Sequence, residues 1–361
     1  MDDEMFQTAL RAFVAERVEP NIDAWERAGA YPASLHAEAG AARLLSLGDV
    51  PGPVPPIHQT RMRMLLEEVT RGGSQGLAVG LCSHFVSLSI LASAGAEAFG
   101  SVIADVLAGA RIIALALTEP DAGSDLTALD ARAALGADGA WRITGEKRFI
   151  CNGARAHCLV LGARAPDGLG LFLVEQPQAE IIGYPLEPSG WRCLPLAAIR
   201  FANARARLIA APDRSGRILR GALTRERLNL AISAASAAEV VSAAVLKHSR
   251  SRLIRNAPLI AMTHVRQTLA ELHTAVAMAR HFVDRTTVED GEVQVAMAKN
   301  AATAAFAFAA QIAVRLHGAA GCVSPSLAER SLRDAPLVAI GGGTTEVMNE
   351  IIARSLERRP E

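Results

Sequence analysis

A change in hydrophobic pattern, which occurs twice along the chain, constrains the fold more than any other feature. Residues 1–115 and 213–361 carry the apolar spacing of helices, whereas residues 116–212 carry short apolar runs between glycine and aspartate turns. This order predicts an α+β protein with three domains at those same bounds. We expect an amino-terminal helical domain, a middle antiparallel β domain and a carboxy-terminal four-helix bundle.

Local patterns support this division. In the first part, helical spacing is found at 9–25, 61–71 and 81–94, with a proline-rich interruption at 51–56. In the middle part, Asp-Gly turns that separate apolar runs predict two β-hairpins, at 138–139 and 167–168. In the last part, helical segments are interrupted at 256–258, 289–291 and 318–325.

The composition argues against several classes of protein. The chain has 361 residues, with 37 Lys and Arg and 37 Asp and Glu, so its formal net charge is zero. A neutral chain argues against nucleic acid as the main partner. Half of the residues are apolar, which is enough for a large core. The weakly polar run at 301–313 is too short for a membrane span and predicts a buried bundle helix.

The cysteines and histidines form no metal-binding pattern. The five cysteines include no CxxC pair, and the histidines form neither HxxxH nor HExxH. We therefore expect no bound metal and no disulfide framework, as in a reducing compartment. The amino terminus is acidic and no apolar signal core follows it, so we expect a cytoplasmic protein.

Glu226 lies where the hydrophobic pattern predicts a buried side chain. The apolar stripe of its segment passes through Leu219, Leu223 and Leu230, and position 226 falls on the same helical face. No Lys or Arg lies three or four positions away to pair with it. A desolvated, unpaired carboxylate has a raised pKa and makes a usable general base. Spacing alone favours a simpler interpretation, in which a slightly turned helix leaves Glu226 solvated.

Three loops are candidate ligand sites. TEPDAGSD at 118–125 follows an apolar strand-like run and offers hydroxyls and backbone N–H groups. KRFICNG at 147–153 is expected to be a loop between strands. GGGTTE at 341–346 opens a helix, where exposed amides favour an anion or a thioester oxygen. Each of these segments is also common as an ordinary turn, strand end or helix cap.

The order of the loops, TEPDAGSD, then GEKRFICNG, then RDA followed by IGGGTTE, resembles the acyl-CoA dehydrogenase family of flavoproteins. The resemblance extends from about residue 60 to residue 356. It implies the same three-domain fold, bound FAD, and removal of two hydrogens from the α and β carbons of an acyl thioester, as in fatty acid metabolism. It also implies a homodimer or homotetramer and an electron acceptor such as an electron-transfer flavoprotein.

The resemblance assigns FAD-binding roles to residues in all three loops and in the bundle. In the first two loops these are Thr118, Ser124, Phe149 and Cys151. Cys151 stands where the family has Ser or Thr, so its hydrogen bond toward the flavin would be weak or lost. Residues that reach a partner's FAD or its adenosine part are Arg252, Arg315, Thr344 and Glu346. Arg315 replaces the family's Gln, and Arg255 and Asn256 replace the usual Phe and Gly.

The catalytic base departs from the commonest pattern of the family. Most members have Glu directly before the Gly-Thr of the last loop, where this chain has Gly342. Members resembling the long-chain and isovaleryl enzymes carry the base on the first bundle helix instead, as Glu followed by Arg-Leu. Since Glu226 is followed by Arg227 and Leu228, the resemblance implies Glu226 as base. It implies Gly342, Arg227 and Ser124 as substrate-binding residues.

In the implied mechanism, the Gly342 N–H and a flavin hydroxyl hold the thioester carbonyl while Glu226 removes the α-proton. The β-hydrogen then leaves as hydride to the flavin.

Three other functions stay open on the sequence alone. The acyl group could be tethered to a carrier protein in secondary metabolism. The departures from the family pattern at Arg255, Asn256 and Arg315 favour this alternative. Cys151 and Gly342 are compatible with a non-catalytic flavin- or acyl-binding subunit. A flavin enzyme that uses oxygen is the third alternative. The sequence does not fix the acyl chain length, its branching or the electron acceptor.

Overall fold

The computed structural model describes residues 1–46 and 59–357, so the proline-rich segment at 51–56 lies outside the described residues. The chain forms two compact units, and each contains several stretches of sequence. The first unit contains Met1–Leu65, Val79–Pro188 and Arg192–Leu223. The second contains Leu66–Ala78, Ser189–Trp191 and Thr224–Glu361. The three-domain boundaries expected from the sequence stay a prediction.

The amino-terminal part is helical, as predicted. Its helices are α1 (Asp3–Phe13), α2 (Ile22–Ala28), α3 (Ser34–Ala41), α4 (Gln59–Arg71), α5 (Gln75–Cys82) and α6 (His84–Leu107). Asp2 caps α1 by accepting a hydrogen bond of 2.8 Å from the Met5 N–H. The single helix expected at 9–25 is divided in the structure, because Pro20 has no N–H with which to continue the helical hydrogen bonds.

The middle part forms one sheet of seven strands within the first unit. These are β1 (Ile113–Ala116), β2 (Arg132–Leu135), β3 (Trp141–Cys151), β4 (Cys158–Ala165), β5 (Gly168–Glu175), β6 (Ile181–Leu186) and β7 (Leu196–Ala210). The strands follow the order β1-β4-β2-β3-β7-β5, with β6 paired to β7. A further pairing of β4 with β5 closes this path on itself, around a core that includes Ile143, Leu161, Phe172 and Phe201.

Both predicted hairpins are confirmed, as β2 pairs with β3 and β4 pairs with β5 in antiparallel register. The sheet is not antiparallel throughout, however. β1 and β2 each pair with β4 in parallel. A parallel pair needs a long connection between its strands, and the chain from β1 to β4 supplies one by passing through the β2–β3 hairpin.

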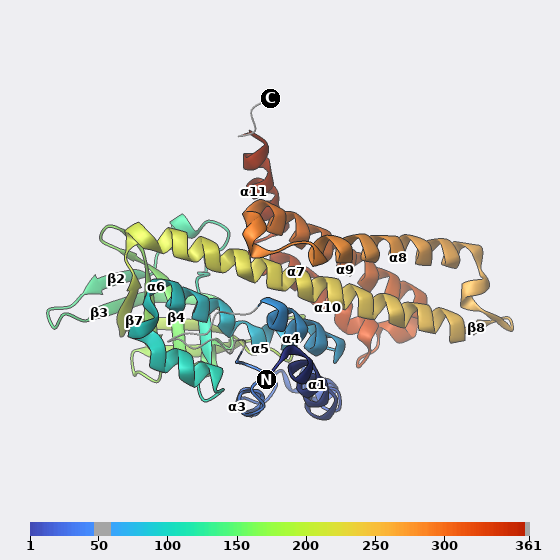
Figure 1. Ribbon diagram of the computed structural model, residues 1–361, viewed down its shortest axis with the longest axis horizontal. Helices are drawn as coiled ribbons and strands as arrows, with labels where there is room; N and C mark the ends of the chain where they lie inside the picture. Colours follow the sequence, from blue (N-terminus) through green and yellow to red (C-terminus); the bar gives the residue numbers. More distant parts are fainter. Residues whose placement is uncertain (47–58, 358–361) are drawn as a thin grey trace. The chain divides into compact units, whose positions relative to one another are not determined.

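The carboxy-terminal part is a helical bundle, as predicted. Its helices are α7 (Pro212–Ser251), α8 (Thr263–Asp284), α9 (Gly291–His317), α10 (Leu327–Ile340) and α11 (Thr345–Glu357). In the second unit, α8 and α9 run lengthwise beside the later part of α7, and α11 projects away from them (Figure 1). The expected interruption at 256–258 is the end of a short hairpin of β8 (Leu253–Ile254) and β9 (Ala257–Pro258). Arg255 and Asn256 form its turn with φ of 48° and 64°, as a two-residue turn of this type requires.

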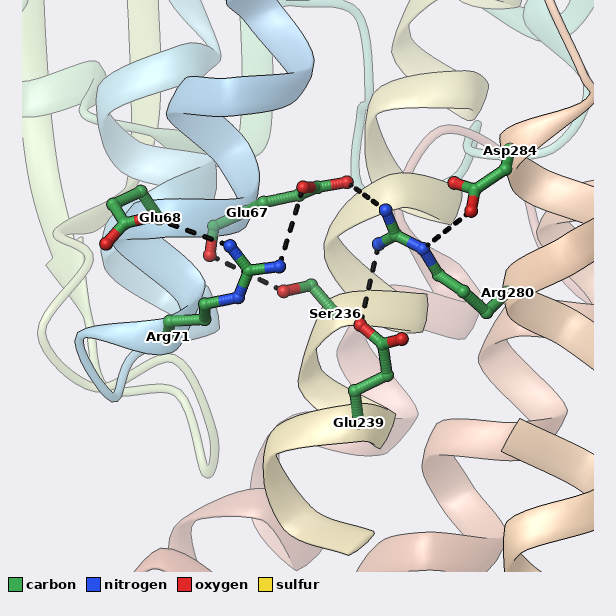
Figure 2. Close-up of polar contacts among 7 residues, drawn as sticks. All are labelled: Glu67, Glu68, Arg71, Ser236, Glu239, Arg280 and Asp284. Carbon is green, nitrogen blue, oxygen red and sulfur yellow. Dashed lines mark hydrogen bonds and ion pairs between the residues drawn. The ribbon is translucent and has the colours of Figure 1, made fainter. Parts of the chain in front are cut away.

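Arg280 of α8 joins three helices of the second unit (Figure 2). Its guanidinium lies 2.7 Å from Glu67 of α4, 3.6 Å from Glu239 of α7 and 3.0 Å from Asp284 of its own helix. Arg71 lies 3.6 Å from the other carboxylate oxygen of Glu67. Because Arg280 and Glu67 are largely shielded from water, their contact holds the end of α4 against the bundle.

Two helical stretches, Gln75–Gly95 and Pro212–Ser251, are long and apolar enough to cross a membrane by length and composition alone. Most of each stretch is buried inside the protein, with 78% and 67% of the most apolar windows covered. Core helices of soluble proteins meet the same criterion, so this is weak evidence for a span.

Candidate active site

Two of the predicted ligand loops lie side by side in the first unit. The Arg148 N–H donates a hydrogen bond of 2.8 Å to the Thr118 carbonyl, which joins the 118–125 loop to β3. The expectation of a loop at 147–153 is wrong for most of its length, because β3 continues to Cys151. An irregularity in register between Lys147 and Ile150 interrupts the strand, as in a β-bulge. Phe149 lies in this irregularity with φ 59° and a ring that is 55% exposed.

A buried ion pair holds the same two segments together. Lys147 Nζ lies 2.7 Å from Glu119 Oε1 and donates a second hydrogen bond of 3.0 Å to the Leu117 carbonyl. Glu119 also accepts from the Ala131 N–H at 3.1 Å. Burial lowers the pKa of Lys147, and Glu119 opposes that shift. Sequence reasoning missed this pair because its two members lie in different motifs, and spacing does not show which distant residues meet.

The hydroxyls predicted to face the flavin are available to a ligand. Thr118 is half-buried and Ser124 is exposed, and neither side chain makes a hydrogen bond to another part of the chain that the structure describes. Cys151 is half-buried at the end of β3, opposite Leu196. The first unit therefore presents two hydroxyls and an exposed aromatic ring from neighbouring segments.

Glu226 lies on α7 in the second unit. Its side chain is half-buried, and within residues 1–46 and 59–357 it has no hydrogen-bond or ion-pair partner. It lies deep among surrounding atoms although part of its surface stays accessible, and burial raises its pKa to about 7. Lys299 acts in the opposite direction, without approaching closely enough to form an ion pair. The raised pKa agrees with the place of Glu226 on the apolar stripe and not with a fully solvated side chain.

Two buried cations hold the triple-glycine loop beside Glu226. Arg227 Nε donates a hydrogen bond of 2.9 Å to the Gly342 carbonyl. Lys299 Nζ, on α9, donates to the carbonyls of Gly343 at 2.8 Å and Ala339 at 3.0 Å. Burial, the charge of Arg227 and, in the opposite direction, Glu226 together lower the pKa of Lys299 to about 8. The predicted role of Arg227 in substrate binding stays a prediction, while the structure shows it anchoring the loop.

Within the described residues, the loop leaves the Gly342 N–H without an acceptor. Gly342 and Gly343 have φ of 67° and 112°, conformations that favour glycine. The N–H groups of Gly341 and Gly343 donate to the carbonyls of Leu337 and Ile340. The Gly342 N–H, by contrast, finds no acceptor in the part of the chain that the structure describes. Its position next to Glu226 is the one expected for a donor to a carbonyl oxygen.

Trp191 packs against the same loop and was not predicted from the sequence. Its backbone has φ 52°, an uncommon conformation for a bulky residue. Its N–H donates to Asp334 at 2.6 Å, and its indole Nε1 donates to Gln75 at 3.2 Å. A Cβ on Gly341 would lie 3.5 Å from the Trp191 ring. The RDA motif thus contributes the carboxylate of Asp334, which holds this aromatic side chain in place.

The residues expected to reach a partner's FAD lie far from the base. Arg252 is exposed directly after α7, about 39 Å along the helix axis from Glu226 at 1.5 Å per residue. Arg315 lies in the last turn of α9 and donates to the Thr268 hydroxyl at 3.2 Å. The ends of α7 and α9 meet, because the rings of His248 and His317 stack with centroids 4.0 Å apart. Arg252 and Arg315 are therefore close to the same end of the bundle.

Thr344 and Glu346 form the start of α11. The Thr344 hydroxyl accepts from the Val347 N–H at 3.3 Å, as a helix cap does. A hydrogen bond from Thr344 lowers the pKa of Glu346. Their predicted contact with the adenosine part of FAD stays a prediction. Among the described residues, no group of three His, Cys, Asp or Glu side chains is arranged to hold a metal ion.

Comparison with known proteins gives matches over most of the chain. Three sequence patterns, described as the acyl-CoA dehydrogenase N-terminal, middle and C-terminal domains, match residues 1–101, 114–204 and 215–357. The long-chain specific acyl-CoA dehydrogenase of Rattus norvegicus mitochondria is 30% identical, over 98% of this chain and 86% of the relative. The short-chain specific enzyme of the same species is 27% identical, over 98% and 90%. The crystal structure of an acyl-CoA dehydrogenase from Geobacillus kaustophilus has a TM-score of 0.91 and 28% identity, over 99% of both chains.

Proposed function

Since this chain belongs to the acyl-CoA dehydrogenase family, we propose that it removes two hydrogens from C2 and C3 of an acyl-CoA thioester, with Glu226 as base. The chain is an oxidoreductase that acts on CH–CH groups. The single observation that carries the proposal is the half-buried, unpaired Glu226 carboxylate with a pKa of about 7, next to the free Gly342 amide. The placement of the base on the first bundle helix, as in long-chain and isovaleryl members, is part of the proposal.

The residues of the first unit fit a flavin, and we propose FAD as the cofactor. The exposed Phe149 ring offers an apolar surface to a flat ring system. The hydroxyls of Thr118 and Ser124 are free to bond its polar edge. When bound, FAD supplies the acceptor for the hydrogen that leaves C3.

The second unit supplies the proton chemistry. The Gly342 N–H donates to the thioester carbonyl oxygen, which stabilises negative charge that develops there as the C2–H bond breaks. Glu226 accepts that proton on its carboxylate. Because its pKa is about 7, the carboxylate form is well populated at neutral pH and is still basic enough to accept the proton.

The proposal includes an electron-transfer flavoprotein as electron acceptor, a homodimer or homotetramer as the assembled form, and a cytoplasmic location. The exposed Arg252, distant from the base of its own chain, supports an assembly in which it serves a partner's cofactor.

A visible spectrum followed by anaerobic titration tests this function. We expect flavin absorbance in the purified protein, and bleaching when acyl-CoA thioesters of graded length are added. Equimolar acyl thioesters on a carrier protein form the parallel arm, since bleaching by these alone would identify a tethered substrate. A protein that neither contains nor takes up FAD, or whose bound FAD no thioester bleaches, would contradict the proposal.

A further inference from the structure

Lys299 is an unusual lysine because its whole side chain is buried. It is 1% exposed on α9, whereas lysines are almost never fully buried unless they are paired. Its hydrogen-bond partners are two backbone carbonyls, one at each end of the glycine loop: Ala339 in the last turn of α10, and Gly343. The Lys299 ammonium group therefore binds both ends of the segment that contains the Gly342 amide.

The charges around Lys299 are unbalanced. Arg227 approaches from α7, is itself buried, and bonds the Gly342 carbonyl. Glu226, from the same turn of α7, is the carboxylate that favours the charged form of Lys299. Glu292 of α9 favours the charged form of Arg227. No carboxylate of the described chain forms an ion pair with Lys299, although Glu226 and Lys299 are close enough for each charge to affect the other's pKa.

A purely structural role does not require this arrangement. Two buried cations carry a desolvation penalty, and well-packed apolar residues often stabilise a fold as well as buried charges do. A positive charge near a carboxylate, however, favours its ionised form. Hydrogen bonds from Lys299 and Arg227 also fix the loop relative to the helix that bears the base.

We propose that Lys299 is a positioning residue of the reaction: it holds the Gly341–Gly343 loop beside Glu226, and its charge favours the ionised form of that base. The inference rests on the proposed function of Glu226. Lys299 contacts neither substrate nor cofactor in this role; it acts through the loop and through its charge.

The test compares Lys299→Met, which removes the charge, with Lys299→Arg, which keeps it. The rate of flavin reduction by a thioester is measured from pH 5 to pH 9. In Lys299→Met we expect the pH of half-maximal rate to rise by roughly one pH unit, and the rate at low pH to fall by about tenfold. Lys299→Arg should move the profile much less. Lys247→Met, which removes an exposed lysine of α7, is the matched control and should leave the profile unchanged.

An infrared titration of the Glu226 carboxyl, with Glu226→Gln protein as the blank, gives a second measurement that needs no turnover. A midpoint higher in Lys299→Met than in the unaltered protein supports the proposal, and an equal midpoint overturns it. If no thioester bleaches the unaltered protein while the midpoint still moves, the proposed function fails and the effect of Lys299 on Glu226 stands. If Lys299→Met does not fold, Lys299→Gln, which keeps a donor without the charge, decides by the same measurement.

Discussion

A Cβ atom placed on Gly342 would lie 3.5 Å from Cγ of Glu226, which is ordinary van der Waals contact. Side chains at positions 226 and 342 therefore compete for one region of space, although one belongs to a long helix and the other to a loop. The two positions that the resemblance gives for a catalytic glutamate converge here, and this chain has a glutamate at the one on the helix.

Glu226→Gln should abolish flavin reduction by acyl thioesters while leaving FAD bound. The substitution keeps the size of the side chain but removes its ability to accept a proton. We expect the rate of bleaching in stopped-flow measurements to fall by about 10²–10⁴-fold. Glu271→Gln, the same change at an exposed position on α8, is the control. A Glu226→Gln protein that bleaches at a normal rate would place the base elsewhere.

Moving the carboxylate from position 226 to position 342 should restore part of the activity that is lost in Glu226→Gly. Glu226→Gly is expected to be inactive, and the double variant Glu226→Gly with Gly342→Glu should be measurably faster. Recovery will be partial, because position 342 has φ 67° and its new Cβ would lie 2.9 Å from Leu230. Adding Leu230→Ala should relieve that contact and raise the rate further. Three variants of equal, negligible activity, all still binding FAD, would argue against a shared location.

The pKa of Glu226 predicts opposite pH dependences for activity and stability. Activity should rise as pH increases through about 7, since the carboxylate is the active form. Stability should change the other way: a folded-state pKa raised from 4.5 favours the folded protein below pH 4.5 and loses that contribution as pH rises to about 7. Thermal unfolding should therefore show Glu226→Gln gaining Tm relative to the unaltered protein between pH 5 and pH 7.5. A Tm difference independent of pH would contradict the raised pKa.

Arg280→Met should destabilise the second unit. The variant leaves the largely buried Glu67 carboxylate without its closest cation. We expect the free energy of unfolding to fall by about 2–3 kcal/mol, less than for a fully buried ion pair because both side chains are partly exposed. Arg354→Met removes an exposed pair with Glu350 and should change stability by less than about 0.5 kcal/mol. Denaturant titrations of the two variants measure the difference in their free energies of unfolding, provided that the two curves have the same slope. Equal midpoints would show that the network in Figure 2 contributes little to stability.

The protein should be at least a dimer. Arg252→Met should weaken the retention of FAD and leave the oligomer intact. The reason is the distance along α7 between Arg252 and the base of the same chain. Light scattering gives the mass, and flavin released on dilution gives the retention, with Arg250→Met as the neighbouring control. A monomer that keeps its flavin would exclude this role of Arg252.

The sequence predicted features that depend on local repetition. The order of helices and strands and both hairpins followed from periodicity and turn residues, because these patterns repeat within a few positions. Periodicity placed Glu226 on the apolar face, but spacing alone favoured a solvated side chain there. Contacts between distant segments were not accessible in this way. Lys299 bonds a carbonyl 44 residues away, and Lys147 pairs with Glu119 across 28 residues. The segment Lys147–Cys151 was expected to be a loop, and its other interpretation, a strand end, is the correct one, with an irregularity in register between Lys147 and Ile150 that the sequence did not indicate.

Glu226 and Arg227 are consecutive on α7, and Arg227 is bonded to Gly342. The proposed proton acceptor and the side chain that holds the proposed carbonyl-binding loop are thus parts of one helical turn. When α7 moves, Glu226 and Arg227 move together. The distance between Glu226 and the Gly342 loop therefore changes less than the position of this 40-residue helix as a whole. Natural variation that shifts this helix would tend to preserve the reacting geometry and change the shape of the surrounding pocket.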